Sequence, residues 1–221
     1  MIIHGRTTPS IVALASRLED VDVEIRWGGD CVPGALNGNC HILNGLEQLE
    51  AFKDAGLSCP AFTIDRDYAK DLAREGNALF GRKLNHSQGK DIRVSCLPRQ
   101  RGHRQWYNSD YFTLYMPSIA EWRFHVFKGK SILRAKKERE QDDHQHAIRS
   151  RRNGYRFRYD IEPKKELREA AKKAVEAAGY DFGAVDVLET ENGYCVLEVN
   201  SRPGMRDELT LSKYEKAIRS L

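Results

Sequence analysis

The spacing of apolar and polar residues predicts a mixture of short strands and helices in the first half of the chain. Residues 21–27 alternate apolar and polar side chains up to Gly28-Gly29, which is typical of a strand that ends in a turn. Apolar residues at regular helical spacing between 46 and 55 indicate a helix that Gly56 closes. By the same reasoning we expect strands over 21–27, 59–64, 77–84 and 92–96, and helices over 44–55 and 65–75.

The second half shows stronger periodicity. Residues 111–117 are extended and aromatic, and residues 121–127 alternate strongly and pair back with 131–135 across a Lys128-Gly129 turn. The stretch from 136 to 154 is polar and reads as irregular. Pro163 opens a helix that Gly179 ends. We then expect a hairpin over 183–200, a Pro-Gly turn and a short final helix.

Composition excludes several classes of protein. A chain of 221 residues with 40% hydrophobic and 31% charged residues is expected to be globular, as one domain or two small lobes. No apolar run approaches the length of a membrane span, and the first residues lack the apolar core of a secretory signal, so we expect a cytoplasmic protein. The odd number of widely spaced cysteines, five in all, predicts reduced thiols and no structural zinc site.

The hairpin at 183–200 is the most informative segment. Glu191-Asn192-Gly193 forms a turn between two apolar strands. If Asn192 is the centre of a three-residue loop, Asp186 faces Glu198, and Asn200 lies on the same face as Glu198. The alternate residues are then expected to face the core, namely Val185, Val187, Leu197 and Val199.

Two carboxylates directly opposite each other on a sheet repel, so an ordinary structural pair is not expected here. A hard divalent cation resolves the repulsion, because Mg²⁺ prefers oxygen ligands. Asp186, Glu198 and Asn200 therefore form a candidate magnesium site, in which phosphate oxygens and water would complete the coordination. The alternative is a solvated polar face on a surface hairpin.

The polar loop at 85–91 is a weaker candidate, for phosphate binding. It carries Ser87, Gly89 and Lys90, and backbone amides in such a turn can hold a phosphate group. Arg82 and Lys83 place further cations beside the loop. The Walker A pattern is absent, so the alternative is an ordinary hairpin loop.

Several ordered segments together resemble an ATP-grasp enzyme. Leu197-Glu-Val-Asn-Ser-Arg-Pro-Gly204 is similar to the family motif L-E-x-N-x-x-P-G, and Val185-Asp-Val to the strand with the first metal carboxylate. Residues 55–60, 85–92 and 121–126 are similar to the start of the nucleotide lobe, the loop over the phosphates and the segment after the hinge. The members it resembles most are carboxylate–amine ligases, such as D-alanine–D-alanine ligases and ribosomal-protein glutamate ligases.

This resemblance implies an α+β fold of ATP-grasp type, in which two α+β lobes clasp ATP between antiparallel sheets. It divides the chain into a reduced N-terminal section, 1–58, a small lobe, 59–116, and a C-terminal lobe, 117–221, with the metal site. The small lobe would contain the phosphate loop, 85–91, and the hinge, 111–117.

The resemblance also implies a reaction. ATP would phosphorylate a carboxylate, and an amine would then attack the acyl phosphate. The implied cofactors are ATP and Mg²⁺, with Mn²⁺ as an alternative metal, and the implied partners are small-molecule or peptide carboxylate and amine substrates. The reduced first section favours a peptide or protein end as substrate. The donor, the acceptor and the oligomeric state stay open.

Site residues follow from the resemblance by position. The expected nucleotide contacts are Arg82, Lys83, Ser87, Gly89, Lys90, Leu114, Tyr115, Met116, Glu121 and Asn200. Among them, Arg82 or Lys83 would contact phosphate, the backbone of 114–116 would bind adenine, and Glu121 would hold the ribose hydroxyls.

Two arginines are expected to act in catalysis. Arg123 would face the γ-phosphate or the acyl group. Ala184 stands where many ligases have an arginine, and Arg202 or Arg206 would take that role; of the two, Arg202 is our choice. His125 shares a strand face with Arg123 and is a candidate general base, with a structural histidine as the alternative.

The middle of the chain is strongly basic and leaves other functions open. Residues 123–158 contain twelve Lys or Arg and four Asp or Glu, a local net charge of +8 within a chain of +4. Such a surface could serve ATP and an acidic acceptor, or bind nucleic acid with nearby aromatic residues. The alternatives to a ligase are thus an ATP-grasp kinase that phosphorylates a hydroxyl and a basic nucleic-acid-binding module regulated by ATP. We do not favour nucleic acid, and we expect no membrane partner.

Overall fold

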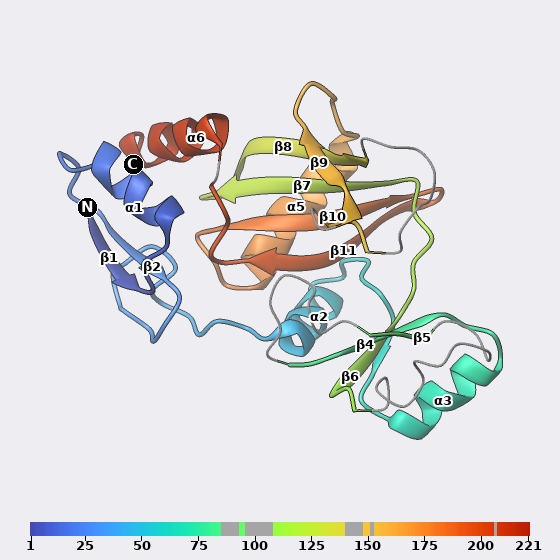
Figure 1. The fold of residues 1–221 in the computed structure, drawn as a ribbon. Helices are drawn as coiled ribbons and strands as arrows, with labels where there is room; N and C mark the ends of the chain where they lie inside the picture. Colours follow the sequence, from blue (N-terminus) through green and yellow to red (C-terminus); the bar gives the residue numbers. More distant parts are fainter. Residues whose placement is uncertain (85–92, 96–107, 140–147, 151–152, 206) are drawn as a thin grey trace.

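The structure is a computed structural model, and it describes residues 1–84, 93–95, 108–139, 148–150, 153–205 and 207–221 (Figure 1). Its strands form three sheets. The N-terminal sheet is parallel, β1 (Ile2–Gly5) with β2 (Glu24–Trp27). The small-lobe sheet has the order β3 (Phe62–Thr63), β6 (Tyr111–Leu114), β4 (Leu79–Arg82) and β5 (Arg93–Ser95). The large sheet has the order β11 (Gly193–Asn200), β10 (Phe182–Thr190), β7 (Ala120–Phe127), β8 (Lys130–Arg139) and β9 (Tyr155–Arg158).

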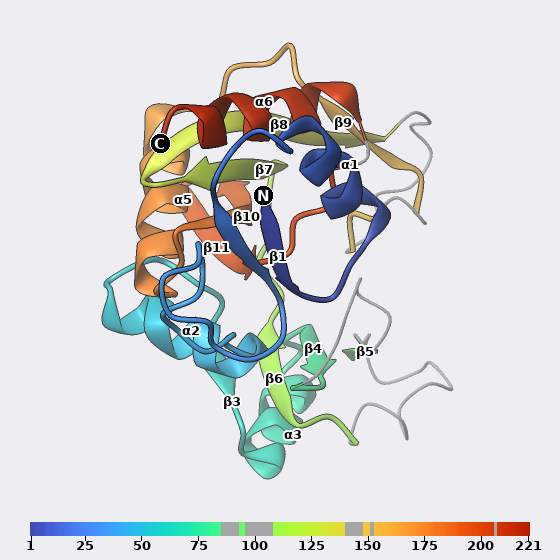
Figure 2. The same cartoon turned by 90° about the vertical axis from the view of Figure 1, so that its left-hand side faces the viewer.

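The N-terminal section contains two elements that the sequence pattern did not predict, β1 and the helix α1 (Pro9–Arg17). Thr8 caps α1, and Pro9 occupies its first turn, where a missing amide costs nothing. The strand expected over 21–27 is confirmed only from Glu24 onward. In Figure 2, α1 lies beside the C-terminal helix α6 (Glu208–Arg219), so the two ends of the chain meet.

The small lobe follows the predicted order of elements. The helix α3 (Arg66–Arg74) confirms the helix expected over 65–75. Asp65 is its N-cap, because the Asp65 carboxylate accepts bonds from the amides of Asp67 and Tyr68. Strands β4 and β5 pair antiparallel on either side of the predicted loop at 85–91, which lies outside the described residues. A small core of Ala69, Leu79 and Phe112 joins α3 to this sheet.

The helix α2 (Gly45–Asp54) confirms the expected helix at 44–55 and shows a complete capping box. Asn44 accepts bonds from the amides of Leu46 and Glu47, and the Glu47 carboxylate accepts one from the Asn44 amide. Its apolar face does not stay within the first section, because Leu49 and Phe52 belong to the main core of the large sheet.

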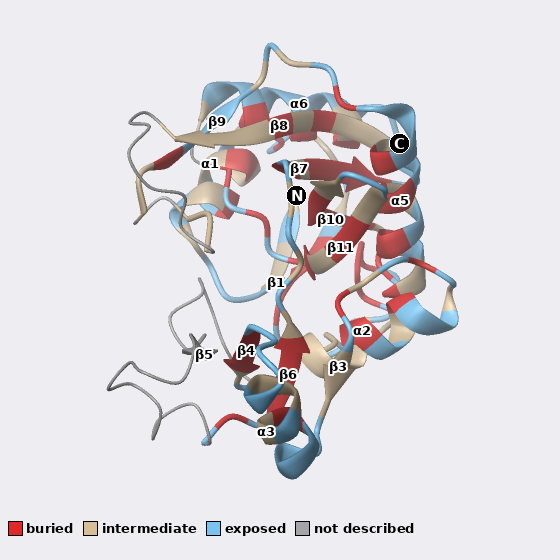
Figure 3. Ribbon diagram, turned by 90° about the vertical axis from the view of Figure 1, so that its right-hand side faces the viewer, coloured by how far each residue is buried: buried red, intermediate tan, exposed pale blue. Residues whose placement is uncertain are grey.

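The large sheet has one apolar face and one polar face. The helix α5 (Lys165–Ala177) covers the apolar face with a stripe that includes Leu167, Ala171 and Val175 (Figure 1). Trp122, Phe124 and Val126 of β7 contribute to the same core. Figure 3 shows the buried colouring along α5 and the central strands. The polar face carries the charged residues of the candidate site.

The hairpin 183–200 differs from the prediction in its loop. Thr190 pairs with Gly193, so two residues rather than three connect the strands, and a register shift follows between Asp186 and Val187. That irregularity restores the expected pairing of Asp186 with Glu198. It also moves Val196 into the core in place of Leu197, which is only half-buried, so the expectation for Leu197 was wrong.

The stretch expected to be irregular, 136–154, is partly sheet. β8 continues to Arg139, and its end pairs with β9 from Tyr155 to Arg158. Residues 140–147 and 151–152 lie outside the described part. Across the described residues, no helix is both long and apolar enough to cross a lipid bilayer.

Candidate nucleotide and metal site

A row of charged residues crosses three neighbouring strands of the large sheet. The strand register places Glu198 opposite Asp186 and Asp186 opposite Arg123. Arg123 donates two parallel hydrogen bonds to Asp186, from Nε to Oδ1 and from Nη2 to Oδ2, each 2.7 Å long. The predicted metal carboxylate and the predicted catalytic arginine are therefore bound to each other in a bidentate pair.

Lys137 of β8 joins this row, although the sequence analysis did not single it out. Its Nζ donates to Asp186 Oδ2 at 2.9 Å and also to Glu121 Oε1. All three side chains are more than nine-tenths buried. A signal existed in the sequence, since Leu133, Ala135 and Lys137 alternate along a strand that was expected to stop at Ala135.

The electrostatics of the cluster follow from burial and pairing. Burial alone would raise the pKa of Asp186, but Arg123 and Lys137 hold it well below its usual range. Burial raises the pKa of Glu121 in spite of its contact with Lys137. Burial would lower the pKa of Lys137, yet Asp186 and Glu121 raise it overall. Asp186 is thus ionised and Lys137 protonated at neutral pH.

Glu198 is the carboxylate of the cluster that forms no ion pair with a described residue. Its Oε1 accepts a bond from Asn200 Nδ2 at 3.0 Å. The donor set of Glu198, Asn200 and, across the strand pair, Asp186 fits a hard cation, because it consists of carboxylate and amide oxygens. No group of three or more His, Cys, Asp or Glu side chains suited to a metal occurs among the described residues, so such an ion would depend on the Asn200 amide and on substrate oxygens.

Arg82 of the small lobe lies near this edge of the large sheet. The pKa of the buried Tyr111 phenol is raised by burial, lowered by the charge of Arg82 and raised by the charge of Glu198, so both charges lie near one hydroxyl. Arg82 also donates from Nε to Thr113 Oγ1 at 3.2 Å. Lys83 is half-exposed and pairs with Asp110 at 2.9 Å. Of the two cations expected near phosphate, Arg82 is therefore the one whose charge acts on the same phenol as Glu198, a predicted metal ligand.

The hinge residues divide into two kinds. The amides of Leu114 and Tyr115 donate to the carbonyls of Ala61 and Ala78, at 2.9 and 2.8 Å, so they serve the small-lobe sheet rather than a bound base. These two amides are therefore already bonded within the protein, and binding of adenine by the backbone of 114–116 stays a prediction. Met116 follows them, half-buried, and within the described residues its amide has no such bond.

Arg149 is a second residue that the prediction of the site omitted. It donates from Nη2 to the carbonyl of Ser118, just after the hinge, at 2.9 Å. Its charge lowers the pKa of Glu121. Its other terminal nitrogen is buried and has no partner in the described part of the chain. An acceptor supplied by a ligand between the hinge and Glu121 would satisfy that nitrogen.

The remaining predicted residues lie at or beyond the edge of the described site. Ser87, Gly89, Lys90 and Arg206 fall outside the described residues. Arg202 is exposed and lies against Gly28 of the N-terminal section.

His125 is buried, and its Nδ1 is 3.1 Å from the Tyr214 hydroxyl of α6. Burial, with the charge of Arg123, lowers the pKa of His125 to about 3, which favours the structural alternative over a general base.

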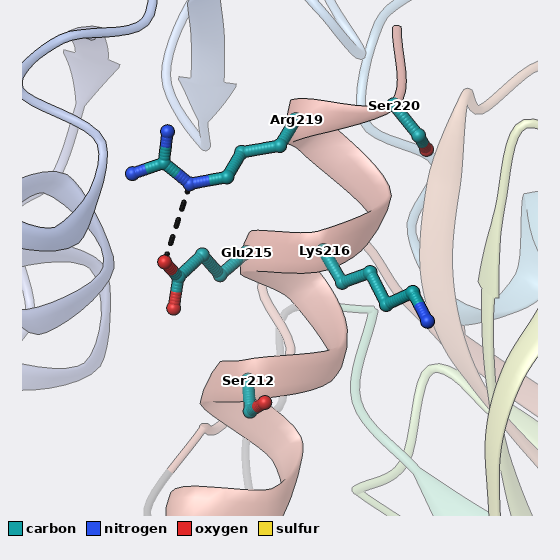
Figure 4. Close-up of a pocket in the computed structure, with 5 residues that line it drawn as sticks. All are labelled: Ser212, Glu215, Lys216, Arg219 and Ser220. Atoms are coloured by element: carbon teal, nitrogen blue, oxygen red, sulfur yellow. Dashed lines mark hydrogen bonds and ion pairs between the residues drawn. The ribbon is translucent and has the colours of Figure 1, made fainter.

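One hollow of the described surface lies away from this row. Figure 4 shows this hollow along α6, of about 460 Å³, lined by Ser212, Glu215, Lys216, Arg219 and Ser220. It contains an exposed Arg219–Glu215 ion pair of 3.3 Å and none of the predicted site residues. The row across β11, β10 and β7 remains the best candidate site because its charges are buried or half-buried and converge.

Comparison with known proteins agrees with this fold. Residues 141–219 match the RimK-like ATP-grasp domain. A D-alanine–D-alanine ligase from Bacillus anthracis is 12% identical, with a TM-score of 0.65 over 99% of this chain and 97% of that one. A RimK domain ATP-grasp protein from Sphaerobacter thermophilus is 12% identical, with a TM-score of 0.63 over 98% and 95%.

The ATP-grasp ligase PsnB, complexed with a phosphomimetic variant of its minimal precursor, Mg and ADP, is 19% identical, with a TM-score of 0.61. The match covers 80% of this chain and 58% of PsnB, so the chain spans less than two thirds of that ligase. No curated protein gives a significant match. The fold is that of the ATP-grasp proteins, and residues 141–219, which begin after β8 and end in α6, match the RimK-like ATP-grasp domain.

Proposed function

We propose that the protein is an ATP- and Mg²⁺-dependent ligase that joins a carboxylate to an amine through an acyl phosphate. The observation that carries the proposal is the row Glu198, Asp186 and Arg123, with Lys137 bonded to Asp186 beside it. Phosphoryl transfer requires charge neutralisation and alignment more than covalent help from the protein, and a buried row of fixed charges supplies both.

The nucleotide would lie between the hinge and this row. The amide of Met116 would bind the base, and Glu121 would accept from the ribose hydroxyls after exchanging its contact with Lys137. The buried free nitrogen of Arg149 would donate to the nucleotide. Arg82 would contact the phosphates, with Lys83, Ser87, Gly89 and Lys90 as further predicted contacts.

Glu198, Asn200 and Asp186 would hold the magnesium ion. When bound, Mg²⁺ supplies charge neutralisation and orientation for the phosphate oxygens. Asp186 would then exchange part of its bonding to Arg123 and Lys137 for the metal, which frees these two cations to face the transferred phosphate and the acyl oxygen. Arg202 would neutralise charge at the same step.

A peptide carboxylate or amine is the substrate class that we favour. PsnB is described in complex with a precursor peptide, and a second neighbour, the macrocyclase MdnC, is described as bound to the precursor peptide MdnA. The MdnC match has a TM-score of 0.53 at 16% identity, so it shows a similar fold only. The peptide substrate is therefore our proposal.

The test is release of phosphate from MgATP across a panel of amino acids and peptides, with mass spectrometry of the products. A ligase requires both a carboxylate and an amine, and it gives a product lighter by one water than its two substrates together. A stable phosphorylated product without an amine would instead show a kinase. Absence of stimulated release across the panel would contradict the proposal.

Glu198→Gln tests the metal assignment in the same assay. We expect turnover to fall by at least about a hundredfold, because the variant loses a negatively charged metal ligand. Glu191→Gln, in the exposed turn of the same hairpin, is the matched control and should keep wild-type turnover. Wild-type turnover in Glu198→Gln would refute the assignment.

A further inference from the structure

The turn after β2 touches Arg202, the arginine that the sequence predicts to be catalytic. A Cβ built on Gly28 would lie 2.8 Å from Arg202 Cδ and 3.1 Å from both Nε and Nη1. The Arg202 side chain therefore passes directly over the bare Cα of Gly28. Gly28 also has a φ of +82°, a conformation that side chains rarely adopt, so two features require glycine here.

Neighbouring residues hold this turn in place. Gly5, at the end of β1, lies so close that a Cβ on it would be 2.2 Å from the Gly28 carbonyl oxygen. Trp27 is buried, and its ring stacks on Phe182 with centroids 5.8 Å apart. Because Phe182 begins β10, Gly28 is tied to the strand that carries Asp186.

The segment around Arg202 is held from the other side. Ser201 and Pro203 are buried while Arg202 is exposed. The amide of Met205 donates to Ser10 Oγ at 3.2 Å, and the Met205 side chain is buried in the cluster that contains Trp27. The backbone of Arg202 is therefore fixed on the N-terminal section, and Gly28 limits where its side chain can lie.

We propose that Gly28 is a positioning residue for Arg202, so that the N-terminal section sets the direction of a guanidinium needed for acyl transfer. The catalytic role of Arg202 in this inference rests on the proposed function. The position of the Arg202 side chain rests only on its contact with Gly28. It gives the short first section a part in the reaction although it forms no separate substrate lobe.

Gly28→Ala and Gly29→Ala form a matched pair of variants. Both glycines have positive φ, +82° and +80°, so alanine introduces similar backbone strain at each. A Cβ on Gly29 meets only the Gly5 Cα, at 3.4 Å, and not Arg202. We expect Gly28→Ala to lower kcat at least about tenfold, with the KM for ATP unchanged, because small displacements of a catalytic group have large kinetic effects. Gly29→Ala should stay within about twofold of wild type.

A double variant separates positioning from general damage. If Gly28 acts through Arg202, Gly28→Ala adds nothing to the loss caused by Arg202→Ala, and the double variant has the kcat of Arg202→Ala. The proposal would be overturned if the losses in kcat of Gly28→Ala and Arg202→Ala multiplied in the double variant. Equal losses in kcat in Gly28→Ala and Gly29→Ala would also overturn it.

The position of Arg202 can be measured without turnover. The Nε–H resonance of Arg202, assigned with Arg202→Lys, should shift in Gly28→Ala and not in Gly29→Ala. An unshifted resonance refutes the contact. A shifted resonance in a protein that ligates nothing refutes the catalytic role of Arg202 and with it the proposed function, while the contact stands.

Discussion

Lys137→Met is the substitution that tests the buried charge cluster most directly. Lys137 bridges Asp186 and Glu121, and the variant leaves Glu121 buried without its cation, while Asp186 keeps Arg123. Removing one partner of a buried ion pair costs about 3–5 kcal/mol. For a chain of this size, each kcal/mol lowers Tm by about 2–4 °C, so we expect a drop of roughly 6–20 °C by calorimetry or circular dichroism.

Lys136→Met is the matched control on the same strand. Lys136 is only partly buried and pairs with Glu138 at 3.0 Å, and such surface pairs contribute about 0–1 kcal/mol. The double variant Lys137→Met/Glu121→Gln should regain at least about half of the loss, because it removes the carboxylate that would be left unpaired. Equal losses in Lys136→Met and Lys137→Met would refute the reasoning.

The same variant has a defined pH dependence. Burial already raises the pKa of Glu121, and loss of Lys137 raises it further. A carboxyl whose pKa is higher in the folded state binds more protons there, so lowering the pH stabilises the fold. The deficit of Lys137→Met should therefore be smaller at pH 5 than at pH 8. An equal deficit at both values would mean that Glu121 is not the source.

Three further predictions concern the supports of the site. Gln48→Ala should cost about 1–3 kcal/mol in urea unfolding, because the Gln48 amide bonds both the carbonyl and the amide of Val199, at 3.2 and 2.8 Å, beside the predicted metal ligand Glu198. Asn44→Ala should cost about 1 kcal/mol through loss of the capping box, and Asn44→Asp should restore most of it. The pKa of His125 is lowered to about 3, so ¹⁵N NMR should show a neutral imidazole down to about pH 4. As the pH drops below about 6.5, the unfolded chain binds a proton at this residue before the folded protein does, so the free energy of unfolding should fall.

The pairing of the predicted metal ligands followed from the sequence, although the loop length assumed for it was wrong. The loop assumed to be centred on Asn192 placed Asp186 opposite Glu198, and the structure confirms that pair. The two-residue loop should have shifted the register by one, and the irregularity beside Asp186 cancels the shift. The alternation of side chains along a strand cannot reveal such a bulge. For this reason the sequence predicted Leu197 in the core, where the structure has Val196.

Lys137 escaped prediction for a different reason. The last four residues of its strand are all charged, namely Lys136, Lys137, Glu138 and Arg139. One face of the strand is polar because it is half-buried, and the other is polar because its buried residue, Lys137, is itself charged. Hydrophobic periodicity assumes that a buried position is apolar, so a strand whose buried residues are ionic reads as a loop. The same assumption hid Arg149, which is half-buried and bonds the carbonyl of Ser118, far from it in the sequence.

The N-terminal section shows why a boundary in sequence need not be a boundary in packing. Residues 1–58 are predicted as a separate section, yet α2 contributes Leu49 and Phe52 to the core under the large sheet. Trp27 of β2 packs with Phe182 of β10 in a second cluster that also contains Phe127 and Tyr214. Removing the section would expose this aromatic cluster at the end of the strands that hold Asp186 and Arg123. The N-terminal section is thus packed on the same sheet that carries Asp186 and Arg123. Gly28 in this section can therefore contact Arg202 directly.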